Sequence, residues 1–174
     1  MAHPLPCRSV AEAHMFLDLI GCDRRERHHR LEDWDDTLIS VYVCMLDGEP
    51  RTFWFESPEN PLIEGFGGDE PSQIIDPGQF ILRADRLSKS VPSNPGDLDP
   101  SAHSVAAQRL DEAADCIDEV IKFIPEGEHQ VPQEAFFTPI GKVSYMEEPG
   151  RFRRARLEAV GQTYREIAAR FKPQ

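Results

Sequence analysis

A ten-residue run of branched and aromatic side chains, Thr37 to Leu46, most restricts what this chain can fold into. Residues of these types favour β-strands. The run ends at Asp47-Gly48, a dipeptide typical of a tight hairpin turn, and the aromatic-rich stretch Arg51 to Glu56 follows. We therefore predict an antiparallel hairpin over about 37–56. Because the first strand is apolar on both faces, we expect it inside the sheet or beneath helices.

Most of the remaining chain has the pattern of amphipathic helices with recognisable start signals. Ser9 followed by Glu12 predicts a capping box, and Asp76-Pro77 and Asp99-Pro100 each place a cap before a first-turn proline. Apolar side chains at helical spacing follow these signals and also follow Pro149-Gly150. The expected helices span residues 9–20, 77–89, 100–124 and 150–171, with shorter helical pieces at 133–137 and 139–146 and a candidate short strand at 73–75.

The predicted fold class is α+β, predominantly helical with a small antiparallel sheet built on the hairpin at about 37–56. A length of 174 residues fits a single domain, 1–174, that needs no disulfide to fold. The cysteines form no Cys-x-x-Cys pair, so we expect reduced thiols, a buried thiol at Cys44 and a cytoplasmic protein. We also expect neither a signal peptide nor a membrane span. The four cysteines are Cys7, Cys22, Cys44 and Cys116.

The charge is strongly acidic and unevenly distributed. The sequence holds 31 acidic and 19 basic residues, a net charge of -12, which disfavours nucleic acid and membrane surfaces as partners. Residues 31–76 contain twelve acids and one base, residues 97–128 are also acidic, and residues 151–172 contain seven bases and two acids. For the basic stretch, which begins Arg151-Phe-Arg-Arg-Ala-Arg156, we expect ion pairs with the protein's own acidic helices.

Two interpretations of the acidic segment remain open. Charged side chains keep many small proteins soluble without further function. The alternative is a docking face for a basic protein, because complementary charge speeds association. The residues assigned to this face are Glu32, Asp33, Asp35, Asp36, Glu59, Glu64, Asp69 and Glu70.

Cysteines and histidines near the hairpin suggest an alternative function, a metal-binding protein or small enzyme with a degenerate zinc-ribbon-like site. A zinc ribbon needs two knuckles that each supply two ligands. Arg25 and Asp47 stand where the second cysteine of each knuckle would lie. We find no serine elbow, cysteine signature or phosphate loop in the sequence, so we assign no catalytic residue, metal ligand or cofactor and expect no enzyme activity. The residues of the alternative site are Cys22, His28, His29 and Cys44.

Several short motifs together resemble a family of uncharacterised bacterial proteins, over the chain from about Ser9 to its end. The resemblance implies that some members carry paired-cysteine knuckles near Cys22 and Cys44, so that a zinc ribbon would be vestigial here, and it implies no activity. The small, acidic character is also similar in type to immunity proteins that neutralise bacterial toxins. The motifs are Gly67-Gly-Asp-Glu-Pro71, Asp76-Pro-Gly-Gln79, Ser90-Val-Pro92 with Leu98-Asp-Pro100, Glu119-Val-Ile-Lys-Phe-Ile-Pro125 and Glu148-Pro-Gly-Arg-Phe-Arg-Arg154.

The function expected from the sequence is therefore a non-enzymatic binding protein. Its closest type is a bacterial immunity protein that neutralises a cognate basic toxin by direct binding through the acidic face. Neither nucleic acid nor a membrane is expected as a partner.

Overall fold

The computed structural model describes residues 3–58 and 65–173. Its contacts divide the chain into two compact units, Met1–Ile75 and Asp76–Gln174, here called the N-terminal and C-terminal units. The fold class is α+β, predominantly helical with one small antiparallel sheet, as predicted. Whether the chain is one domain is not decided by this division, and that expectation stays a prediction.

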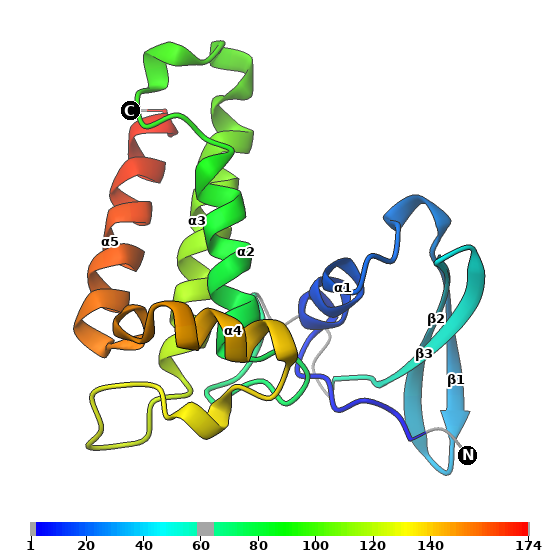
Figure 1. Cartoon of the computed structure of the whole chain (residues 1–174). Coiled ribbons are helices and arrows are strands. Elements are labelled where there is room, and N and C mark those ends of the chain that lie inside the picture. Colours follow the sequence, from blue (N-terminus) through cyan, green and yellow to red (C-terminus); the bar gives the residue numbers. More distant parts are fainter. Residues whose placement is uncertain (1–2, 59–64, 174) are drawn as a thin grey trace. The chain divides into compact units, whose positions relative to one another are not determined.

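The N-terminal unit contains a three-stranded antiparallel sheet in the order β1-β2-β3 (Figure 1). Strand β2 (Thr37–Leu46) and strand β3 (Glu49–Glu56) form the predicted hairpin, which is confirmed. Strand β2 lies in the centre of the sheet, as its apolar faces led us to expect. Strand β1 (His28–Trp34) was not predicted, and it pairs with β2 along its whole length.

A two-residue turn at Asp35 and Asp36 holds β1 against β2. Both residues have positive φ, 49° and 66°, the backbone region that two-residue hairpin turns of type I′ require. The turn between β2 and β3 has the same character, with φ of 53° at Asp47 and 79° at Gly48. The second turn is recognisable from its glycine, whereas the first has none.

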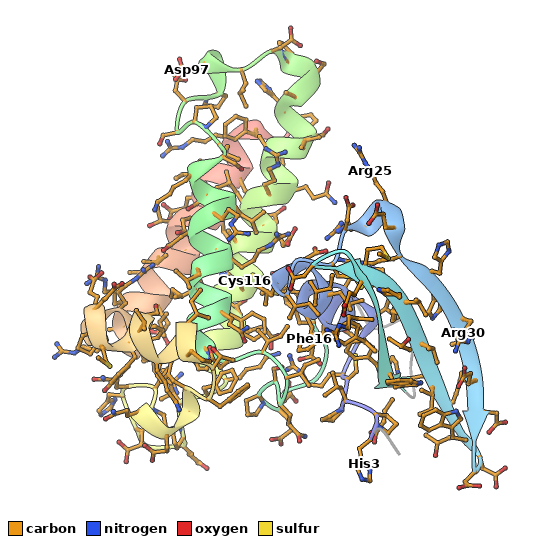
Figure 2. The ribbon with its side chains drawn as sticks, turned by 45° about the vertical axis from the view of Figure 1, so that its right-hand side comes forward. His3, Phe16, Arg25, Arg30, Asp97 and Cys116 are labelled. Atoms are coloured by element: carbon orange, nitrogen blue, oxygen red, sulfur yellow. A yellow bond between two sulfur atoms is a disulfide. The ribbon has the colours of Figure 1, made fainter. Side chains whose placement is uncertain are left out.

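Helix α1 (Val10–Leu19) packs on one face of this sheet (Figure 2). The ring of Phe16 meets those of Phe53 and Phe55 edge to face, with centroids 6.2 and 5.7 Å apart. Ser9 caps the helix, since its Oγ accepts from the backbone N–H of Glu12 at 3.0 Å. The carboxylate of Glu12 bonds elsewhere, so only half of the predicted capping box forms.

The buried Glu12 carboxylate instead joins the start of the chain to α1. It accepts from the backbone N–H of Arg8 at 2.7 Å and from Arg8 Nε at 2.8 Å. The same guanidinium donates to the carbonyl of Glu70 at 2.5 Å. Upstream, Leu5 bonds the outer side of β3, donating to the carbonyl of Trp54 and accepting from the N–H of Glu56. The N-terminal segment therefore covers the β3 edge of the sheet.

In the C-terminal unit, the long helix α3 (His103–Ile121) packs against both α2 (Pro77–Lys89) and α5 (Arg154–Phe171). Helix α4 (Pro139–Glu147) contacts α2 (Figure 1). The apolar stripes of α3 and α5 supply much of the core. Its side chains include Leu110, Ala113, Ala114, Ile117, Leu157, Ala168 and Phe171.

The predicted helix bounds agree with the structure to within a few residues, and the largest differences lie at the starts of α3 and α5. Helix α1 is one residue shorter at each end than predicted, and α3 ends at Ile121 rather than at 124. The bounds of α2 are those predicted, and α4 is one residue longer. A 3₁₀ turn at Pro100–Ala102 precedes α3, and another at Pro149–Phe152 precedes α5, where the predicted helices were drawn as continuous. The piece predicted at 133–137 is a 3₁₀ turn, and the candidate strand at 73–75 is wrong, because that segment forms bends.

The buried carboxylate of Asp76 joins the starts of α2 and α4. Its Oδ1 accepts from the backbone N–H of Gln79 at 3.0 Å, completing the predicted cap of α2. Its Oδ2 accepts from the N–H and the Oγ1 of Thr138, the cap of α4, at 2.8 and 2.7 Å. Gly78 and Gly141 allow this approach, because a Cβ on Gly141 would lie 2.1 Å from Oδ2.

We predict that Gly141→Ala lowers the free energy of unfolding by about 2–4 kcal/mol, because the added methyl overlaps Asp76 and must break the shared cap. Gly150→Ala is the matched control, since a Cβ there meets no atom within 4 Å. Urea denaturation followed by circular dichroism measures both. Equal losses in the two variants would contradict a cap shared between α2 and α4.

Candidate functional site

The free end of the β1–β2 hairpin gathers four of the predicted site residues. Glu32 and Asp33 occupy the end of β1, and Asp35 and Asp36 form the turn. The side chains of Asp33, Asp35 and Asp36 are exposed, and that of Glu32 is partly buried. We call these four residues the acidic hairpin end.

Glu32 differs from its three neighbours because its carboxylate is already paired. It accepts from Trp34 Nε1 at 2.9 Å and from Arg30 Nε at 2.8 Å. The hydrogen bond from Trp34, followed by that from Arg30, lowers the pKa of Glu32. Within residues 3–58 and 65–173, Asp33, Asp35 and Asp36 take part in no ion pair.

Apolar groups lie directly beside these carboxylates. Leu38 is paired with Asp33 across the two strands and is 49% exposed. On the opposite face, the rings of Trp34 and Trp54 lie 6.4 Å apart with a 42° tilt. Exposed apolar side chains bordered by charge are typical of surfaces that contact other proteins.

The other predicted site residues do not join the acidic hairpin end. Asp69 and Glu70 are exposed on a separate loop of the N-terminal unit, held by Arg8 through the Glu70 carbonyl. Glu59 and Glu64 lie outside the described residues. The structure thus brings together half of the eight residues assigned to the docking face.

Cys22 and Cys44 are joined by a disulfide, with their Cα atoms 6.0 Å apart. The expectation of a buried free thiol at Cys44 is therefore wrong. The two cysteines lie 22 positions apart, and the β1–β2 turn brings them together by reversing the chain between them. Because the cytoplasmic expectation assumed reduced cysteines, it loses part of its basis.

The disulfide also changes the alternative metal site. Both sulfur atoms are bonded to each other, and His28 and His29 are adjacent on β1, where neighbouring side chains point to opposite faces. His29 stacks on Tyr42, with ring centroids 4.6 Å apart. In the part of the chain that the structure describes, no three His, Cys, Asp or Glu side chains are placed to hold a metal ion.

We predict that replacing Cys22 and Cys44 with alanine lowers the free energy of unfolding by about 3 kcal/mol, the entropic cost of releasing a loop of this length. Thermal unfolding with and without dithiothreitol measures the effect. The reductant should destabilise the wild-type protein and leave the double variant unchanged. A wild-type protein indifferent to dithiothreitol would show that the bond does not form in solution.

An ion-pair cluster that the sequence did not predict lies before β1. Asp18, at the end of α1, accepts from Arg24 Nε at 3.1 Å and from Arg27 Nη2 at 2.5 Å. Arg27 also donates to the carbonyl of Cys22 at 2.5 Å. Partial burial opposes ionisation of Asp18, but hydrogen bonds from Arg24 and Arg27 outweigh it and lower the pKa of the carboxyl. This cluster fixes the segment that leads from α1 into β1.

We predict that Asp18→Asn costs about 1–3 kcal/mol of unfolding free energy at neutral pH. Because the folded pKa of Asp18 is lowered, its stabilising effect is complete above the ordinary aspartate pKa of about 4 and is lost as the pH falls through the lower folded value. The difference between wild type and variant should therefore shrink in acid. Denaturation across this pH range measures it, with the exposed Asp33→Asn as control. A difference independent of pH would contradict the ionised pair.

The basic carboxy-terminal stretch pairs with acidic residues of its own unit, as predicted. Arg151 contacts Asp85 of α2 at 2.6 Å, and Lys172 contacts Asp111 of α3 at 2.8 Å. The acidic partners of these arginines lie mainly on α2, on α3 and at the start of the turn before α5. The remaining pairs are Arg151 with Glu148, Arg165 with Asp118, Arg156 with Glu148 and Arg154 with Glu158.

No protein-family model matches this chain, and comparisons with curated proteins and with solved structures found no significant match. Among the described residues, no helix combines the length and the apolar character needed to cross a membrane.

Proposed function

We propose that this chain is a non-enzymatic protein that binds a basic protein through the acidic hairpin end, in the manner of an immunity protein that neutralises a toxin. The observation that supports it is the grouping of three exposed carboxylates, at Asp33, Asp35 and Asp36, beside the exposed Leu38. No ion pair within residues 3–58 and 65–173 neutralises these three. By contrast, three basic residues of α5, Arg154, Arg156 and Arg165, are paired inside their own unit.

The local geometry suits fast association with a basic surface. Unpaired carboxylates at an exposed hairpin turn attract a cationic partner at long range. They have no ion pair within the described residues that must be broken when the partner binds. The turn is held by two paired strands, and the Cys22–Cys44 disulfide ties the opposite end of this hairpin, so little ordering remains to be done on binding. Leu38 supplies apolar contact at the centre of the charged group.

Asp69 and Glu70 belong to the proposal as a second acidic group of the same unit. Glu59 and Glu64 belong to it from the sequence alone. A cytoplasmic location and a cognate bacterial toxin are also parts of the proposal. Co-expression with a basic toxin encoded beside the gene should give a complex whose association slows as salt is added. If the co-expressed basic toxin formed no complex with this chain, at low salt or at physiological salt, the proposal would be contradicted.

We predict that the double variant Asp35→Asn, Asp36→Gly weakens binding of the basic partner by roughly tenfold, mainly through a slower association rate. Asn-Gly is the preferred pair for a two-residue turn with positive φ, so the variant removes two charges while the backbone is kept or stabilised. Surface plasmon resonance at two salt concentrations measures the rates.

The matched control is Asp47→Asn, which removes a carboxylate at the same kind of turn, with φ of 53°, at the opposite end of the sheet. It should leave binding unchanged. Because the control removes one charge where the double variant removes two, a control that lost half as much binding free energy as the double variant would mean that net charge, and not the acidic hairpin end, governs binding.

A further inference from the structure

The sheet of the N-terminal unit has one covered edge and one open edge. Leu5 bonds the outer side of β3, but among the described residues no segment pairs with the outer side of β1. Figure 2 shows Arg30 on this outermost strand. An open edge presents unpaired backbone N–H and C=O groups that can join another strand.

The backbone of β1 defines which residues face outward. In a two-residue hairpin turn, the flanking residues, here Trp34 and Thr37, form a hydrogen-bonded pair, and the pattern alternates along the strand. The backbone groups of every second residue therefore point away from β2. These outward residues are His29, Leu31 and Asp33.

The charges along β1 change sign at its centre. The cationic Arg30 precedes Leu31, and the carboxylates of Glu32 and Asp33 follow it. If two copies of β1 pair antiparallel about Leu31, Arg30 of each copy lies opposite Glu32 of the other. His29 of each copy lies opposite Asp33 of the other. The opposite charges of Arg30 and Glu32, which face each other across the two strands, are stabilising.

Other arrangements of the same two strands oppose like charges. Parallel in-register pairing places Arg30 on Arg30 and Glu32 on Glu32. Moving the centre of an antiparallel pair by two residues removes the pairing of Arg30 with Glu32, and the shift centred on residue 33 places Asp33 on Asp33. Charged residues usually protect an edge strand from pairing, but here they exclude these registers and favour the one centred on Leu31.

The centre of this register is apolar. Leu31 is 56% exposed on its own chain, although it lies within a strand. Pairing about Leu31 would place this side chain against its counterpart. The in-chain contact of Arg30 with Glu32, 2.7 Å between Nη2 and Oε1 at the surface, adds little stability by itself. In the pair of copies it extends into a network of four charges.

We propose that β1 is a self-association edge, through which two copies of this chain join antiparallel about Leu31 into a continuous six-stranded sheet. The proposal does not rest on the proposed function, but it shares Glu32 and Asp33 with the acidic hairpin end, because both residues face the second copy in the dimer. Asp35 and Asp36 lie beyond β1 and stay open in both copies. The dimer therefore carries two acidic turns, one at each side of the new pairing.

We predict that the full chain sediments as a reversible dimer between micromolar and millimolar concentrations. Glu32→Arg and Arg30→Glu should each weaken dimerisation by roughly tenfold or more, because each sets like charges opposite one another at two places. An equimolar mixture of these two single variants should recover a heterodimer. In that mixture, positions 30 and 32 are both basic in the first variant and both acidic in the second. Wherever position 30 of one copy faces position 32 of the other, the two charges are therefore again opposite. Analytical ultracentrifugation measures all these states.

The double variant with Arg30→Glu and Glu32→Arg is the matched control. It carries both substitutions but restores complementary charges, so it should dimerise like the wild-type protein. A wild-type chain that stays monomeric throughout, or single variants that dimerise as well as the wild type, would overturn the proposal. Circular dichroism melts of each variant separate loss of folding from loss of pairing.

Discussion

The two-residue turn at Asp35 and Asp36 is the constraint on which the N-terminal unit's surface depends. Left-handed backbone is unfavourable for most side chains, and aspartate tolerates it better than most because its short carboxylate interacts locally. By reversing the chain there, the turn creates the edge strand β1 and places its charges beside β2. It also exposes two carboxylates at the tip. One backbone conformation thus determines both surfaces proposed above.

A buried carboxylate organises each unit in a similar way. Glu12 and Asp76 are both fully buried, which would be costly for an unpaired charge. Each accepts a backbone N–H from outside its own helix, at Arg8 and at Thr138. Each therefore joins a helix start to a distant or preceding segment, and the free energy lost on removing it is large because several donors lose their acceptor together.

Features with strong local signals were predictable from the sequence. Asp76-Pro77 marks the start of α2 and Asp47-Gly48 the β2–β3 turn, because cap, proline and glycine restrict the backbone without help from distant residues. Strand β1 was not predicted, since an exposed edge strand with charges on both faces lacks the alternation that identifies strands. The Cys22–Cys44 bond depends on that strand and was missed with it.

The candidate site shows the same limit. Composition located the acidic segment but could not separate the paired Glu32 from the unpaired Asp35 and Asp36, because pairing depends on which side chains share a face of β1. For the same reason, the role of Arg24 and Arg27 in holding Asp18 was not apparent from a sequence that shows only a cluster of bases.

The Cys22–Cys44 disulfide encloses the whole of β1 and its turn within one covalent ring. A single proteolytic cut anywhere between the two cysteines would therefore release no fragment. Both severed ends would remain attached, one through each cysteine, so the edge strand and the acidic tip stay in reach of their positions in the sheet. Exposed turns are preferred sites of proteolytic cleavage, and here the ring retains both cut ends of such a turn within the N-terminal unit.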